Sequence, residues 1–134
     1  MFNQKKPPPI KSLIAQGSRI DGNYHFTEGL RVDGELVGDI QAPADAPSIL
    51  MISESASVTG AVRAHHVIVN GSVTGPVTAT ELLELQPKAR IIGDVTYKAL
   101  EMHQGAVIQG VLKPLMGGVE GAEKPALTLA ASNQ

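Results

Sequence analysis

The stretch from Val58 to Val77, VTGAVRAHHVIVNGSVTGPV, contains one five-residue phrase twice. The first copy is VTGAV at residues 58–62, and the second is VTGPV at residues 73–77. Between them, the run from His66 to Val69 alternates as a strand does. A segment that returns to its starting phrase has a period, and periodic self-similarity is typical of repeat architectures.

The same five-residue pattern, apolar-x-Gly-x-apolar, recurs along most of the chain. Successive central glycines are separated by 16, 22, 15, 18 and 17 residues. The long interval contains the Pro- and Ala-rich segment 42–47, which reads as a loop inserted at one corner. The six glycines are Gly22, Gly38, Gly60, Gly75, Gly93 and Gly110.

A second strand-like run precedes each glycine phrase from the second onward, and its alternation indicates one buried and one wet face. The runs are LRV at 30–32, LMI at 50–52, VIV at 67–69, LEL at 83–85 and LEM at 100–102. Three short strands per turn of about 17 to 18 residues predict an all-β fold, a parallel β-helix of about six rungs. At about 4.8 Å per rung, the prism is roughly 25 to 30 Å long.

The prediction divides the chain into three segments. Residues 1–16 form a disordered, basic, Pro-rich leader, because Pro7, Pro8 and Pro9 exclude a helix. Residues 17–113 form the β-helix domain, and residues 114–134 form a disordered C-terminal tail rich in small residues.

Composition narrows the classes of function. The chain has 134 residues, a net charge of -2 and no cysteine. These values disfavour nucleic acid as a partner and exclude disulfides, thiolate metal sites and a cysteine nucleophile. The sequence has no run of about 18 apolar residues and no secretory signal, so we expect a cytoplasmic protein.

Side chains suited to catalysis do not form a recognisable constellation. The histidines, His25, His65, His66 and His103, are expected at the surface or at corners. Asp21, Asp33, Asp39 and Asp94 stand next to or near corner glycines, where turn chemistry explains them. No phosphate-binding loop or nucleophile elbow is present, so we predict no enzyme and no cofactor.

One enzyme class remains an alternative, the hexapeptide-repeat acyltransferases, whose left-handed β-helix also has coils of about 18 residues. That family repeats an aliphatic residue every six positions. Here the interval from Leu85 to Ile91 is six residues and that from Val69 to Val73 is four. The uneven spacing favours a looser, right-handed helix.

A β-helix ends in two rungs whose backbone groups have no neighbour above or below, and uncovered edges recruit other chains. No amphipathic capping helix is evident at either end of the sequence. We therefore predict end-to-end polymerisation, and the alternative is a monomer whose tails cover both ends. The predicted interface residues are Ile20, Tyr24, Phe26 and Leu30 at the first end and Met102, Val107, Ile108, Val111 and Leu112 at the last.

The order of these repeats resembles the bactofilins. The resemblance rests on LRVDGELVGDI at residues 30–40 and VIVNGSVTG at residues 67–75, and it covers residues 17–113. It implies a right-handed parallel β-helix between disordered tails, which assembles without nucleotide into non-polar filaments. Such filaments are cytoskeletal scaffolds that localise cell-wall and polarity proteins at the inner face of the cytoplasmic membrane. Ile108 stands where bactofilins often carry an aromatic residue, which implies a weaker contact there.

The N-terminus MFNQKK is similar to the short membrane-targeting leader of some bactofilins, with Met1, Phe2, Lys5 and Lys6 as the targeting residues. Burial of one aromatic side chain contributes about 1.5 to 3 kcal/mol, and each lysine near anionic headgroups contributes about 1 kcal/mol. These energies hold a single chain only weakly, whereas a polymer presents many leaders. A solubilising tail, or a peptide that docks in a partner's groove, is the alternative reading.

Overall fold

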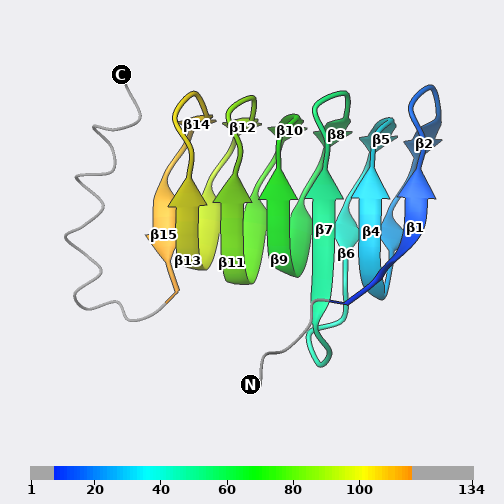
Figure 1. Ribbon diagram of the computed structural model, residues 1–134, viewed down its shortest axis with the longest axis horizontal. Coiled ribbons are helices and arrows are strands. Elements are labelled where there is room, and N and C mark those ends of the chain that lie inside the picture. The colour runs from blue at the N-terminus through cyan, green and yellow to red at the C-terminus, as the bar shows by residue number, and fades with distance from the viewer. Residues whose placement is uncertain (1–7, 116–134) are drawn as a thin grey trace.

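The computed structural model describes residues 8–115, and every regular element in that range is a β-strand. The strands form the three sides of a prism, and all of them pair in parallel with the strand one turn away (Figure 1). Residues 1–7 and 116–134 lie outside the described range, and so do the predicted targeting residues Met1, Phe2, Lys5 and Lys6.

Each turn of the chain contributes one strand or half-strand to each side. The first side contains β1 (Ile10–Ile14), β4 (Glu28–Val32), β7 (Ser48–Ile52) and the second halves of β9 (Val62–Val69), β11 (Val77–Leu85) and β13 (Val95–Met102). The second side contains β2 (Arg19–Asp21), β5 (Glu35–Val37), β8 (Ser57–Thr59), β10 (Ser72–Thr74), β12 (Arg90–Ile92) and β14 (Val107–Gln109). The third side contains β3 (Tyr24–His25), β6 (Ile40–Gln41), the first halves of β9, β11 and β13, and β15 (Leu112–Pro114).

The register of the second side confirms the predicted period. Successive partners there are offset by 16, 22, 15, 18 and 17 residues, the same intervals that separate the corner glycines. Leu83 lies opposite Leu100 and Ile91 opposite Ile108, both at the predicted offset of 17. The chain is therefore a parallel β-solenoid of six turns, and the right hand of its coil stays a prediction.

The core consists of aliphatic side chains stacked in columns along the axis. On the first side, Leu50, Val67 and Leu83 lie opposite one another in successive rungs, and each is 0% exposed. The second side adds one inward residue per rung, such as Val58 and Val73. Branched aliphatic residues suit this arrangement because their side chains pack closely on a pleated surface.

The corner glycines form a column of their own, at the turn between the second and third sides. Gly60 has φ +148°, and a Cβ at this position would collide with the carbonyl oxygen of Gly38 in the rung below. Gly75 stands in the same relation to Gly60. The close stacking of the rungs at this corner requires residues without a side chain, since any Cβ would force the rungs apart.

The predicted start of the domain at residue 17 is wrong. Strand β1 lies within the segment assigned to the disordered leader and pairs with β4, with Ser12 opposite Leu30 and Ile14 opposite Val32. Sequence alternation did not reveal it because a serine occupies an inward position, whereas Leu13 points outward and is 58% exposed. The first rung is therefore complete, with one strand on each side.

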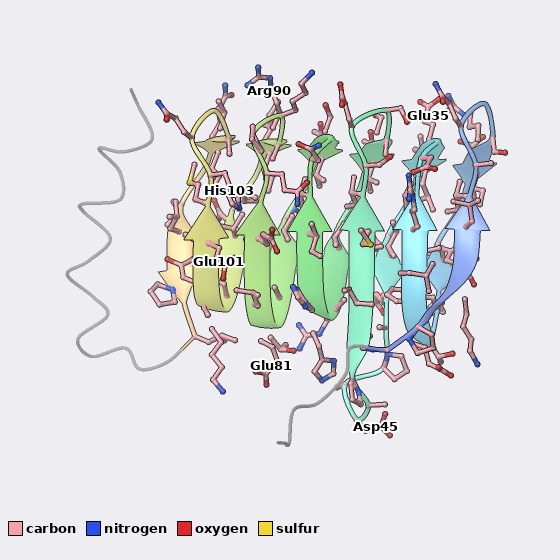
Figure 2. The ribbon with its side chains drawn as sticks, viewed as in Figure 1. Glu35, Asp45, Glu81, Arg90, Glu101 and His103 are labelled. Carbon is pink, nitrogen blue, oxygen red and sulfur yellow. The ribbon has the colours of Figure 1, made fainter. Side chains whose placement is uncertain are left out.

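The predicted corner insertion is also present. Residues 42–47 connect β6 to β7 and extend beyond the line of the other corners, where Figure 1 shows a single protruding loop. Figure 2 places Asp45 at the end of this loop. The loop leaves the stacking intact, because Leu36 and Val58, on either side of it in sequence, still lie opposite each other.

Candidate functional site

The two ends of the prism are the places where the regular pairing stops. The nine-stranded sheet ends in β1 and β15, and the six-stranded sheet ends in β2 and β14. Among residues 8–115, each of these strands has one partner only, so its second edge carries peptide groups that no other described strand satisfies. Such edges are templates for pairing with another chain.

Apolar residues that pack against the core and are still partly exposed are concentrated in the same two rungs. Interior rungs bury their inward side chains on both faces, whereas the inward side chains of a terminal rung have one face uncovered. All six hydrophobic residues that pack against the core while staying partly exposed belong to the first or last rung, within the described range. They are Ile20, Tyr24, Leu100, Met102, Ala106 and Leu112.

The structure places the predicted residues of the N-terminal end at two depths. Ile20 and Tyr24 are inward residues of the first rung and are half-buried. Phe26 is only 5% exposed, and Leu30 is fully buried because β1 covers β4. Leu30 therefore belongs to the second rung and does not reach the open face of the single chain. Ile14, which sequence reasoning omitted, is the inward residue that lies over Val32.

The predicted residues of the C-terminal end all belong to the last rung. Met102 and Leu112 point inward and are half-buried, and Ile108 is 6% exposed. Val107 is half-buried at the start of β14, and Val111 is 56% exposed at the corner. The prediction missed Leu100 and Ala106. Its own offset of 17 would have located Leu100, because that offset sets it beside the buried Leu83.

Asx side chains tie neighbouring rungs together at the glycine corner. Asp39 Oδ1 accepts a hydrogen bond from the Ala61 N–H at 2.9 Å, and Asp94 Oδ1 accepts one from the Val111 N–H at 3.0 Å. Lys113 Nζ lies 3.4 Å from Asp94 Oδ2. The two aspartates are predicted to bond to nearby backbone in the turn, and in the structure each bonds to the backbone of the next rung. Asp94 in this way holds the last rung to the fifth.

These contacts lower the pKa of Asp94 below its ordinary value of 3.8, chiefly through the hydrogen bond from Val111 and then through Lys113. A carboxyl group whose pKa is lower in the folded state stabilises the fold above its unfolded pKa, and this contribution is lost as the pH falls through the folded pKa. We therefore expect Asp94→Asn to lower the melting temperature near neutral pH, and this deficit to shrink as the pH falls below 3.8. Thermal melts followed by circular dichroism measure the difference. A deficit that stays constant down to about pH 2 would contradict this role.

Asp21 and Asp33 make different contacts from the other two aspartates. Asp21 accepts a hydrogen bond from Arg19 at 3.1 Å, and Arg19 also lies 3.3 Å from Glu35 in the next rung. Asp33 accepts hydrogen bonds from Arg31 and from the hydroxyl of Ser53, which lower its pKa in that order. These carboxylates have structural partners within the described chain.

The histidines do not form a common centre. His65 Nδ1 lies 3.3 Å from the hydroxyl of Ser48, a serine–histidine contact that resembles half of a catalytic pair. Ser48 is only 2% exposed, and its oxygen also accepts a hydrogen bond from the His65 N–H, so its hydroxyl is not open to a substrate. His103 lies near Glu84 and Glu101 on the first side.

Within the described range, no helix is long and apolar enough to cross a membrane.

Comparison with known proteins shows the family of the chain. The family model for bactofilin, described as polymer-forming cytoskeletal, matches residues 12–113, about three quarters of the chain. The chain belongs to the bactofilin family. It is therefore related to polymer-forming cytoskeletal proteins that associate with themselves.

Two relatives come from Myxococcus xanthus. Bactofilin BacP is 31% identical over 115 residues, which cover 86% of this chain and 43% of BacP. Bactofilin BacO is 25% identical over 109 residues, which cover 81% of this chain and 83% of BacO. The chain thus spans less than half the length of BacP. No solved structure gives a significant match.

Proposed function

We propose that this bactofilin polymerises end to end through its two terminal rungs, without nucleotide, and that the filaments act as a scaffold. The observation that carries the proposal is the coincidence, in the same two rungs, of unpaired strand edges and of all six partly exposed core residues. Joining two ends satisfies the peptide groups and buries the apolar side chains in one step. Neither effect requires a bound nucleotide.

The test is negative-stain electron microscopy of the purified full chain, combined with sedimentation over a range of protein concentrations. We expect filaments without added nucleotide, and the same filaments after nucleotide is added. Uniform monomers at every concentration would overturn the proposal and favour the alternative in which the tails cover both ends.

We further propose that the filaments lie at the inner face of the cytoplasmic membrane, held there by the N-terminal leader. Strand β1 begins at Ile10, eight positions after Phe2. Even fully extended, these eight residues span no more than about 29 Å. Because every subunit of a filament carries one leader, weak insertion of Phe2 and attraction of Lys5 and Lys6 to anionic headgroups are multiplied along the filament.

Phe2→Glu is expected to abolish pelleting with anionic liposomes while leaving filaments intact. The substitution removes the aromatic group that inserts and adds a charge that anionic headgroups repel. Co-sedimentation with liposomes measures binding, and microscopy of the same samples verifies the filaments. Asn3→Glu is the matched control, since it adds the same charge one residue away and keeps Phe2. Equal pelleting of the wild type and Phe2→Glu would exclude insertion.

Assembly through the ends leaves the three lateral sides of the prism free along the whole filament. We propose that proteins of cell-wall synthesis or cell polarity bind there as clients. Rigid, repeated surfaces of this kind position many copies of a client along one line. Cross-linking of filaments in cells, followed by identification of the attached proteins, tests this part of the proposal, and recovery of only the chain itself would count against it.

A further inference from the structure

Three side chains with metal-binding atoms meet on the outer surface of the first side, at its C-terminal end. They are Glu84 of β11, Glu101 of β13 and His103, which follows β13. One ligand atom from each lies within 4.8 Å of the others. Among the described residues, this is the one group of three such side chains, and Figure 2 shows Glu101 and His103 on that surface.

The backbone of the solenoid fixes this arrangement. Glu84 lies directly opposite Glu101 in the parallel pair formed by β11 and β13. The His103 N–H donates to the carbonyl of Leu85 at 2.9 Å, which holds the histidine beside the fifth rung. The donors therefore come from two hydrogen-bonded rungs, and little chain entropy is lost when they converge.

Within the described range, no lysine or arginine forms an ion pair with either carboxylate of this group. Two carboxylates that face each other across adjacent strands repel. The other carboxylates that form ion pairs in the described range do so with lysine or arginine. Glu84 Oε2 has His103 Nε2 at 3.6 Å and accepts a hydrogen bond from the uncharged amide of Gln86 at 3.3 Å, whereas Glu101 forms no ion pair there. A neutral imidazole supplies a lone pair to the group and no positive charge.

We propose that Glu84, Glu101 and His103 bind one divalent transition-metal ion of the Zn²⁺ or Co²⁺ type. One imidazole nitrogen with two carboxylate oxygens suits such ions, whereas Mg²⁺ and Ca²⁺ prefer oxygen ligands alone. Ligands around Zn²⁺ stand about 3.4 Å from one another when each bond is about 2.1 Å long. The separation of 3.6 Å between His103 Nε2 and Glu84 Oε2 is close to that value.

Glu101, the third ligand, can reach the ion by rotation of its side chain alone, because it is exposed and lies in the outermost rung. Water completes the coordination, so the ion exchanges freely. Binding ties the sixth rung to the fifth and removes the carboxylate repulsion at the same time. The inference concerns the single chain and holds whether or not the chains polymerise.

The test is equilibrium dialysis of the untagged full chain against ZnCl₂ or CoCl₂, with bound metal measured per chain. We expect about one ion per chain, and a loss of affinity of about tenfold or more in His103→Gln and in Glu101→Gln. His25→Gln and Glu81→Gln are matched controls, since each removes a residue of the same type elsewhere on the prism, and they should bind as the wild type does.

Two further readouts separate coordination from a structural effect. Zn²⁺ should raise the melting temperature of the wild type and of the controls but not that of His103→Gln, because a ligand stabilises only the state that binds it. Bound Co²⁺ should show visible absorption bands that depend on His103. Absence of binding at millimolar metal, or equal binding by the wild type and His103→Gln, would overturn the proposal.

Discussion

Replacing Leu112 with arginine is expected to prevent assembly at the C-terminal end while leaving the solenoid folded. Leu112 points inward in the last rung and is partly exposed there, so in the single chain the guanidinium can extend to water through the open end. A second copy docked on that end would enclose the charge without a partner. Breaking a junction in this way costs several kcal/mol, on the order of 3 to 5.

Sedimentation and microscopy measure this effect, and circular dichroism verifies the fold. If like ends join, as the bactofilin resemblance implies, the variant should form dimers through its intact N-terminal end. The matched control is Ile92→Arg, which introduces the same charge at a 52% exposed position on the lateral surface of the fifth rung. Filaments of normal length from Leu112→Arg would place the contact elsewhere. Ile108 is a poorer choice, because it is 6% exposed and a charge there threatens the fold itself.

Gly60→Ala is expected to destabilise the solenoid by at least about 3 kcal/mol. The residue has φ +148°, a conformation that strains any residue with a side chain, and the new Cβ would collide with the backbone of Gly38. The rungs on both sides of this corner are fixed by hydrogen bonds, such as that from the Gly60 N–H to the Thr74 carbonyl. The clash cannot be relieved locally, so the stacking must open.

Urea unfolding followed by circular dichroism gives the change in the free energy of unfolding. Gly22→Ala is the matched control, because Gly22 occupies the same corner in the first rung with φ +133° and has no atom within 4 Å of its added Cβ. It should cost about 1 kcal/mol, from backbone strain alone. Equal losses at the two positions would show that strain, and not the contact between rungs, makes glycine necessary.

The repeat arithmetic predicted much of this fold from sequence. A glycine is required wherever two rungs touch at the corner, so the glycine spacings match the register of the strands one for one. The insertion at residues 42–47 was visible for the same reason, since it lengthened a single interval. A steric requirement of this kind fixes the residue type at each corner, so it can be read from the sequence.

The end rungs were harder to predict, because a terminal strand is covered on one face only. Such a strand tolerates a weaker alternation of apolar and polar residues. Strand β1 places Ser12 inward and Leu13 outward, so alternation does not identify it. Leu30 is consequently predicted at the open end, although β1 covers it. The cluster around His103 was within reach of the sequence. The offset of 17 residues already sets Glu101 beside Glu84, but neither residue stands out as a motif.

Parallel pairing along the whole prism has a consequence for how the filaments would be recognised. If the end rungs of two subunits pair edge to edge, the spacing of about 4.8 Å between strands continues across each junction, even where two like ends meet and their strands run antiparallel. Such a filament gives the fibre-diffraction reflection that is usually taken as the mark of amyloid, although every subunit is natively folded. A second, longer repeat, set by the six rungs of one subunit, would distinguish the two, because amyloid stacks identical strands without a subunit boundary.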